Sequence, residues 1–185
     1  MTHRVCPWWL GYWLICPVRS WWQHPHEILV PYVHQGMTVL EPGPGMGYFT
    51  LELARMVGDG GRVIAVDVQP QMIERLKRRA ARAGVPGRLD ARVAPAESMG
   101  ISDLRDSVDF TLAFAVVHEF PDTGCFFAEV AGASKAGAAL LLAEPIGHVK
   151  DAAFESELQA AAQAGFTVVD RPLIRRSHTA LLKKG

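Results

Sequence analysis

The feature that most constrains the fold of this chain is a turn with three glycines at alternate positions: Gly43, Gly45 and Gly47. The apolar run over 38–40 predicts a short buried strand before this turn, and Glu41 closes it. A run with helical composition follows over 48–57. Glycine at such a junction gives access to positive φ and lets a ligand lie against the main chain, while the helix start offers unpaired N–H groups. The turn therefore predicts a ligand site, with a purely structural turn that packs strand against helix as the alternative.

The spacing of the glycines argues against two common nucleotide-binding turns. In a dinucleotide fingerprint, G-x-G-x-x-G, the third glycine comes five places after the first. Here it comes four places after the first, and Tyr48 occupies the fifth place. No G-K-[ST] follows to hold a triphosphate. A nicotinamide oxidoreductase therefore stays only as an alternative that the spacing disfavours.

Strand-like and helix-like runs alternate along the rest of the chain. We expect further strands at 62–67, 89–94, 108–117, 137–143, 166–171 and 175–182, and the main helices at 71–83, 121–134 and 152–164. Apolar runs such as 62–67 are typical of buried parallel strands. Because two strands that can close as a hairpin follow the last helix, the pattern predicts an α/β doubly wound sheet with one antiparallel strand near its edge.

Composition limits the partners of the chain. Its 185 residues suffice for one domain with a sizeable core, and lysine plus arginine equal aspartate plus glutamate at 19 each, so net charge favours neither nucleic acid nor an anionic membrane. We expect one local basic cluster to be a solvated helix face rather than a polyanion site: Arg75, Lys77, Arg78, Arg79, Arg82, Arg88 and Arg92. The cysteines lack metal-ligand spacing, so we expect no metal and a cytoplasmic location: Cys6, Cys16 and Cys125.

Asp67 is a second candidate for ligand binding because it ends the second expected strand. In open α/β sheets, ligands bind beyond the carboxyl ends of the strands. A carboxylate at this place can accept hydrogen bonds from both hydroxyls of a ribose. The alternative is that Asp67 interacts with the start of the helix expected from residue 71.

The pattern E-x-G-x-G-x-G over 41–47 resembles the nucleoside-binding turn of class I S-adenosylmethionine-dependent methyltransferases, and the resemblance covers about 27–184. It implies a Rossmann-like, three-layer α/β/α fold with strand order 3-2-1-4-5-7-6 and an antiparallel last strand. It also implies S-adenosylmethionine as the cofactor. By this resemblance Glu41 orients the α-amino group of the cofactor, Val68 packs on its adenine, and the turn lies against its methionine moiety and ribose: Gly43, Pro44, Gly45 and Gly47.

The turn after the third expected strand departs from this family. Family members often have G-D-A-E there, with the aspartate accepting a hydrogen bond from the adenine amino group. Here the sequence is Ala94-Pro95-Ala96-Glu97, so Pro95 occupies the place of the aspartate. Adenine recognition is then expected to rest on the backbone of Ala96 and Glu97, or on the Glu97 side chain.

The segment that leaves the fourth expected strand carries the candidate catalytic residues. By resemblance, Phe114 contacts the cofactor, and His118 and Glu119 are the ionisable groups that arrive near its methyl group. Imidazole titrates near neutrality, so His118 is a candidate general base; its alternative is a hydrogen bond that shapes the turn. Glu144 and His148, after the fifth strand, can contact substrate or cap a loop. Methyl transfer from a sulfonium depends mainly on proximity and alignment, so an obvious base is not required.

Residues 1–35 form an expected N-terminal arm, and 36–185 the expected cofactor-binding domain. All five tryptophans lie within 8–22, and Pro7 and Pro17 bracket only nine residues, so we expect no stable membrane insertion. The arm can cover the cleft as a lid, pack against a sheet edge or the second copy of a homodimer, or rest at a membrane interface.

We expect a methyltransferase for a small, apolar or aromatic acceptor. A protein that binds or senses the cofactor without turnover is the alternative.

Overall fold

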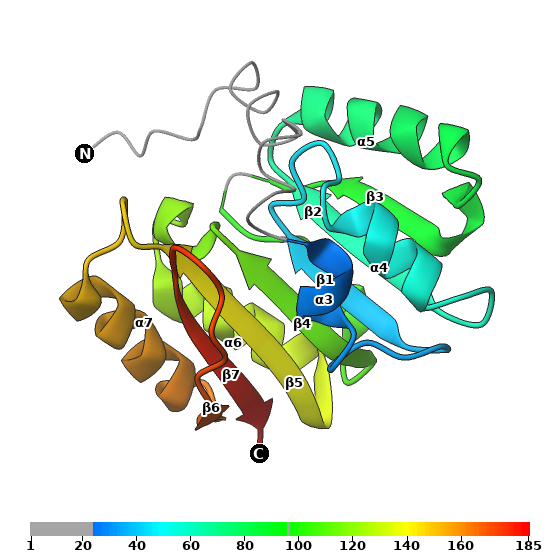
Figure 1. Ribbon diagram of the computed structural model, residues 1–185. Coiled ribbons are helices and arrows are strands. Elements are labelled where there is room, and N and C mark those ends of the chain that lie inside the picture. Colours follow the sequence, from blue (N-terminus) through cyan, green and yellow to red (C-terminus); the bar gives the residue numbers. More distant parts are fainter. Residues whose placement is uncertain (1–23, 96) are drawn as a thin grey trace.

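The structure, a computed structural model, describes residues 24–95 and 97–185 (Figure 1). The expectations placed on residues 1–23, as a lid, a dimer contact or a membrane contact, lie outside the described residues, as does Ala96. Within the described part no helix is long and apolar enough to cross a membrane.

A seven-stranded sheet forms the middle layer, and its strand order is β3-β2-β1-β4-β5-β7-β6. β1 to β5 pair in parallel, whereas β7 runs antiparallel between β5 and β6. This order and direction confirm the expected fold. The strands are β1 (Thr38–Pro42), β2 (Arg62–Asp67), β3 (Leu89–Val93), β4 (Val108–Phe114), β5 (Ser134–Pro145), β6 (Phe166–Asp170) and β7 (Ser177–Lys184).

Helices cover both faces of this sheet (Figure 1). The helices are α3 (Pro25–Leu29), α4 (Thr50–Met56), α5 (Pro70–Arg82), α6 (Thr123–Ala133) and α7 (Asp151–Gln163). Alternate side chains of a strand point to opposite faces. Leu140 and Leu142 of β5 therefore share a core with α6 and α7, whereas Leu141 shares one with α3 and α4. Three layers result, and the turns that carry the candidate site lie where the parallel strands end.

The fourth strand is shorter than the sequence pattern predicts. The apolar run suggested a strand over 108–117, but β4 ends at Phe114. Ala115 has φ 55°, outside the range of a strand, and a short 3-10 turn, η4 (Val117–Glu119), follows. The apolar side chains of Val116 and Val117 are buried in this turn instead. The prediction that the strand continues over 115–117 was wrong, because a buried turn and a buried strand both give an apolar run in the sequence.

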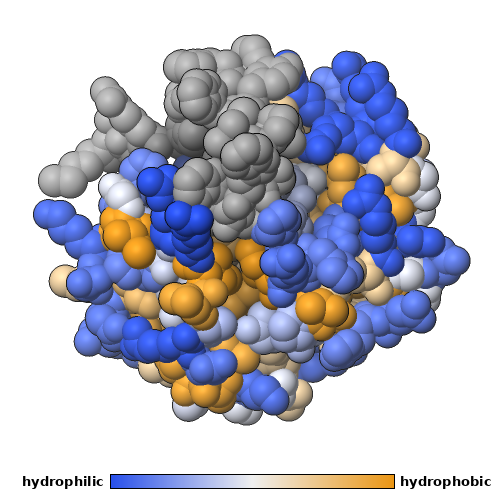
Figure 2. Space-filling view, in the orientation of Figure 1, coloured by the Kyte–Doolittle hydropathy of each residue, from blue (hydrophilic) through white to orange (hydrophobic). Residues whose placement is uncertain are grey.

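Three residues of the basic cluster on and after α5 form surface ion pairs: Arg78, Arg88 and Arg92. Hydrophilic residues cover α5 in the space-filling view (Figure 2). Arg78 pairs with Glu74 at 2.5 Å, and Arg88 pairs with Asp59 at 2.5 Å. These pairs favour the expected solvated face over a polyanion site. Arg79 differs from its neighbours, because its guanidinium reaches a backbone carbonyl of the glycine-rich turn.

Candidate cofactor and acceptor site

The three glycines of the turn after β1 all have positive φ, at 64° for Gly43, 55° for Gly45 and 86° for Gly47. This conformation is costly for residues with a Cβ. A Cβ at Gly43 would also lie 2.5 Å from Cγ2 of Val116, which follows β4. The backbone N–H of Gly43 donates to the carbonyl of Val66 in β2 at 2.8 Å. The turn therefore lies between the ends of β2 and β4, where the fold brings a ligand.

Glu41 lies at the base of this turn and is buried, with 4% of its surface exposed. Burial raises the pKa of Glu41 to about 8, and the nearby Thr50 hydroxyl opposes the rise. Among the described residues, Oε2 of Glu41 has no hydrogen-bond partner. A buried carboxyl without a partner is destabilising, and a cationic group beside it would offset that cost. The arrangement fits the α-amino group of an amino-acid ligand such as the methionine moiety of S-adenosylmethionine.

Asp67 ends β2 beside the same turn. Its Oδ1 accepts a hydrogen bond from the backbone N–H of Gln69 at 2.8 Å, and Gln69 itself is the N-cap residue of α5. Asp67 therefore shapes the approach to the helix but is not its capping residue. Burial raises the pKa of Asp67 to about 6, while the amides of Gln69 and Gly45 oppose the rise. The contact with Gly45 brings the candidate ribose acid and the candidate methionine turn together, as the sequence predicted.

Two exposed valines lie beside Asp67. Val68 is 41% exposed, and Val93, which pairs with Asp67 in the sheet register, is 49% exposed. Exposed apolar side chains at the carboxyl edge of a sheet suit a flat, apolar ligand surface such as a purine base. The sequence pointed to Val68 alone. Val93 was missed because its position inside the expected strand gave no sign that its side chain faces outward.

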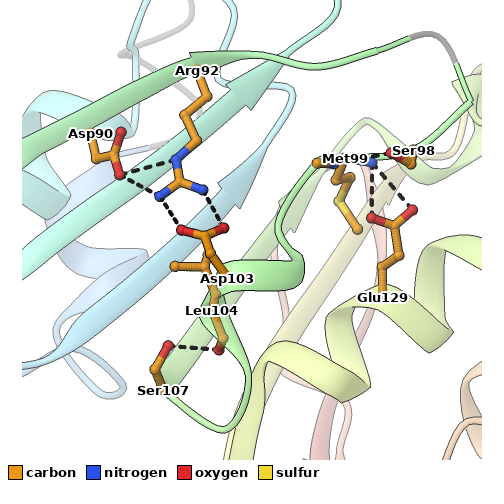
Figure 3. Close-up of polar contacts among 9 residues, drawn as sticks. Asp90, Arg92, Ser98, Met99, Asp103, Leu104, Ser107 and Glu129 are labelled. Carbon is orange, nitrogen blue, oxygen red and sulfur yellow. Dashed lines mark hydrogen bonds and ion pairs between the residues drawn. The ribbon is translucent and has the colours of Figure 1, made fainter.

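The loop after β3 is anchored at both ends (Figure 3). Arg92 bonds to Asp90 in its own strand and to Asp103, with Nη1 at 2.7 Å from Oδ1 of Asp103. Further along, the N–H of Met99 donates to both carboxylate oxygens of Glu129 in α6, at 2.9 and 3.2 Å. These contacts hold the described residues on the two sides of the candidate adenine contacts at 95–97.

Pro95 lies in this loop with its side chain exposed, and its Cδ would be 3.3 Å from a Cβ at Gly100. The ring therefore packs on its own loop and supplies no hydrogen bond. Glu97 is also exposed. The N–H of Ala94 donates to the carbonyl of Asp67 at 2.9 Å, which holds the start of the loop against β2. Contact of Pro95, Ala96 and Glu97 with adenine stays a prediction.

Phe114, the last residue of β4, is half-buried, and its ring centroid lies 4.5 Å from that of Phe49. Tyr48 packs edge-on against Phe49 at 5.2 Å. These three rings form an aromatic group between the glycine-rich turn and the end of β4. Phe114 therefore lies beside the residues that follow Gly47, and its contact with the cofactor stays a prediction.

Glu144, at the end of β5, organises the turn that follows β4. Its carboxylate is fully buried, and Oε1 accepts hydrogen bonds from the backbone N–H groups of Val116 at 3.1 Å and Val117 at 2.7 Å. Its Oε2 accepts from Nδ1 of His118. Of the two roles expected for Glu144, the structure favours the capping role. The sequence named both residues of the pair but gave no sign that they meet.

His118 therefore has its Nδ1 engaged, and proton exchange with an acceptor would use Nε2. The hydrogen bond to Glu144 raises the pKa of His118, and the charges of Glu119 and Glu157 add to the rise. Glu119 follows in the same short turn and is half-buried. The ring of His148, from the loop after β5, stacks with that of His118 at 6.2 Å. The candidate acid–base residues thus gather at one place.

Glu157 is a further member of this group that the sequence did not indicate. It lies on α7, is 5% exposed, and has no partner for Oε2 within the described residues. Burial raises the pKa of Glu157 to about 8, and the charge of Glu144 contributes to the rise. Glu157 lies on the buried stripe of α7 with Phe154, Leu158 and Ala161, and this helical spacing is the sequence signal that could have indicated its burial. Among the described residues no group of three or more His, Cys, Asp or Glu side chains could hold a metal ion.

The sheet order, the glycine-rich turn after β1 and the acid that ends β2 define a Rossmann-like fold of the class I S-adenosylmethionine-dependent methyltransferase type. A family model described as a methyltransferase domain matches residues 33–176, and the chain belongs to this family. The cofactor of the family, S-adenosylmethionine, carries a cationic amino group that fits Oε2 of Glu41, which has no hydrogen-bond partner within 24–95 and 97–185.

Known proteins agree with this assignment. Over 71 residues, 38% of this chain, the sequence is 35% identical to a ubiquinone/menaquinone biosynthesis C-methyltransferase from Enterobacter sp. (strain 638), and the match spans only 28% of that relative. A methyltransferase structure from Aquifex aeolicus superposes with a TM-score of 0.82 at 22% identity, covering 97% of this chain and 98% of the other. A structure from Methanococcus maripaludis, described as a putative methyltransferase, gives 0.77 at 14% identity, covering 100% and 97%. The structural likeness shows the fold.

Proposed function

We propose that this protein transfers the methyl group of S-adenosylmethionine to a small acceptor, with His118 as the general base. The proposal rests on a series of contacts that connects the cofactor turn to His118. Val116 packs against Gly43 of the cofactor turn, and its N–H bonds to Glu144, which also holds His118. Because three contacts link the cofactor turn to an oriented imidazole, a proton acceptor lies beside the expected methyl donor.

Different residues of the chain would bind different parts of the cofactor. Glu41 would hold the α-amino group, the backbone of the turn 43–47 would lie against the methionine moiety, and Asp67 would accept hydrogen bonds from the ribose hydroxyls. Val68 and Val93 would pack on adenine, together with the backbone of the loop at 95–97. When bound, S-adenosylmethionine would supply the methyl group from its sulfonium, and the neutral thioether S-adenosylhomocysteine would be the leaving group.

His118 would take the proton of the acceptor hydroxyl, thiol or amine at Nε2 as the acceptor atom forms its bond to the methyl carbon. Buried Glu144 fixes the ring and stabilises the imidazolium that forms. Proton removal is secondary to alignment in such a displacement, so the main role of the fold is to hold both reactants in line.

The acceptor is proposed to be small and to carry an apolar or aromatic part. The group of Tyr48, Phe49 and Phe114 supports this class, because aromatic rings favour contact with other rings. The partial similarity to a quinone-pathway methyltransferase makes phenols and quinols sensible first candidates. A cover over the acceptor by residues 1–23 belongs to the same proposal, because Leu29 and Val33 of the expected arm are buried in the core.

A second candidate function is binding or sensing of the cofactor without turnover. The exposed Pro95, which supplies no hydrogen bond where family members have an aspartate, favours it. The two functions separate in one assay. The protein is incubated with methyl-labelled S-adenosylmethionine and a panel of phenolic, quinol, thiol and amine acceptors, with S-adenosylhomocysteine and labelled product measured together. Binding of the cofactor without product across the panel would favour the sensor, whereas labelled product establishes the transferase.

A further inference from the structure

Helix α5 contacts the glycine-rich turn at two points. Nη1 of Arg79 donates a hydrogen bond to the backbone carbonyl of Met46. Cδ1 of Leu76 lies so close to Gly47 that a Cβ there would overlap it. Leu76 and Arg79 are three residues apart on a helix and therefore share one face. The same face thus presents an apolar contact and a cationic donor to consecutive residues of the turn.

The turn needs contacts of this kind. Glycine loses more backbone freedom on ordering than any other residue, so three positive-φ glycines do not hold one conformation by themselves. Within and around the turn, the N–H of Gly47 donates to Pro44 at 2.9 Å and the N–H of Gly43 donates to Val66 at 2.8 Å. In both of these hydrogen bonds the turn acts as the donor, through a backbone N–H group. The bond from Arg79 holds the Met46 carbonyl, which belongs to the same planar peptide unit as the Gly47 N–H, so this unit is held from both sides.

The placement of Arg79 differs from that of a solvated cation. Its neighbour Arg78 is 69% exposed and pairs with Glu74 on the surface of the helix. Arg79 is only partly exposed, and burial lowers its pKa. Withdrawing a guanidinium from water is unfavourable unless a hydrogen bond offsets the cost, and the Met46 carbonyl supplies that bond.

We propose that Leu76 and Arg79 form a clamp that fixes the glycine-rich turn in its binding conformation and so sets the affinity for the cofactor. Arg79 is a positioning residue, acting through the backbone of Met46. The start of α5 also carries Gln69, whose N–H bonds to Asp67. One rigid helix therefore positions both the ribose acid and the methionine turn. The effect on affinity rests on the proposed cofactor site, whereas the effect on the turn itself does not.

The test compares Arg79→Met, which keeps an apolar stem but removes the donor, with Arg79→Lys, which keeps a charged donor. Arg82→Met, at an exposed position of the same helix, is the matched control. Calorimetry with S-adenosylhomocysteine should show about tenfold weaker binding for Arg79→Met, the loss expected from one hydrogen bond to a charged group. Arg79→Lys should recover part of this loss, and the control should bind like the wild type. In a turnover assay, KM for the cofactor should rise while kcat is unchanged.

Amide hydrogen exchange of the unliganded protein provides the second readout. Exchange within 45–48 should become faster in Arg79→Met than in Arg82→Met, while the core strands keep their protection. Equal exchange and equal affinity in the two variants would overturn the clamp. If the wild type fails to bind S-adenosylhomocysteine, the cofactor assignment falls, and the exchange comparison still decides whether Arg79 holds the turn.

Discussion

Buried Glu144 pairs with half-buried His118 between the ends of β5 and β4, and the carboxylate of Glu144 also accepts hydrogen bonds from the N–H groups of Val116 and Val117. The pair couples the shape of the turn after β4 to the orientation of the imidazole. It also fixes which ring nitrogen is available, since the tautomer of a histidine follows from the hydrogen bond at its other nitrogen.

Glu144→Gln should lower kcat by on the order of a hundredfold if His118 is the general base. The amide can still accept from the two backbone N–H groups, but its NH₂ would donate to Nδ1. The proton of neutral His118 would then sit on Nε2, where it cannot take another. Rates are measured with saturating cofactor and acceptor, and Glu155→Gln, an exposed position on α7, serves as the control. Full activity of Glu144→Gln would contradict the role of His118.

The pH dependence of turnover follows from the same pair. Glu144 raises the pKa of His118 above its ordinary value of 6.5, and a general base acts only when it is unprotonated. The rate should therefore rise with pH, with a midpoint above 6.5. A rate that is flat from pH 6 to 9, with chemistry shown to be rate-limiting, would count against proton removal by this histidine.

Cofactor binding should release a proton from Glu41. Burial raises the pKa of Glu41 to about 8 in the unliganded protein, so the carboxyl is mostly protonated at pH 7. A ligand ammonium beside it favours the ionised form. Calorimetry at pH 7 in buffers of different ionisation enthalpy should give close to one released proton for S-adenosylhomocysteine. Glu41→Gln should abolish this release and weaken binding.

The control for this experiment is 5′-methylthioadenosine, which has the nucleoside but lacks the amino-acid part. It should bind without releasing a proton from Glu41. Equal heats for S-adenosylhomocysteine in all buffers would show that Glu41 does not face the amino group.

Glu157 should make stability fall as the pH rises. Its pKa in the folded protein is about 8, above the ordinary value of 4.5, so the fold favours the protonated carboxyl. This contribution to stability is fully present below about pH 4.5 and is lost as the pH rises through 8. Glu157→Gln mimics the protonated form. It should match the wild type near pH 4 and exceed its free energy of unfolding by on the order of 4 kcal/mol at pH 8.

Urea unfolding at a series of pH values measures this difference. Glu155→Gln, at an exposed position on the same helix, should leave the dependence of the free energy of unfolding on pH as it is in the wild type. Parallel pH profiles for Glu157→Gln and the wild type would show that Glu157 ionises normally in the fold.

Gly43→Ala and Gly45→Ala separate backbone strain from side-chain contact. Both positions have positive φ, so each substitution should cost about 1 kcal/mol in the free energy of unfolding. A Cβ at Gly45 meets nothing within 4 Å, whereas one at Gly43 meets Val116. Gly43→Ala should therefore cost a further 1–3 kcal/mol or so through overpacking. Val116→Ala should restore part of that loss in the double variant, and additive effects would show that the contact is absent.

The sheet and the strand-end residues were predictable from the sequence because both follow from local patterns. Alternating apolar and helical runs fix the topology of a doubly wound sheet, and the ends of its parallel strands must converge. Glu41, the glycines and Asp67 could be identified in this way. Pro95 could be recognised as a departure only through the family resemblance.

The partners of these residues could not be predicted, since they depend on neighbours in space. Glu144 and His118 lie 26 residues apart and meet through the pairing of β4 with β5. Arg79 has the sequence surroundings of a surface cation, and only the packing of α5 turns it toward Met46. The spacing of Phe154 and Ala161 places Glu157 on the buried face of α7, but its approach to Glu144 depends on how that helix packs.

Binding of S-adenosylhomocysteine tests the central claim most directly, because every assigned role depends on a cofactor lying between the glycine-rich turn and Asp67. Calorimetry should give one site per chain for the wild type and at least about tenfold weaker binding for Asp67→Ala, since both ribose hydroxyls lose their acceptor. Asp59→Ala, at a carboxylate that is 92% exposed and precedes the start of β2, the strand that Asp67 ends, should bind like the wild type. No binding by the wild type, or equal binding by Asp67→Ala, would contradict the account.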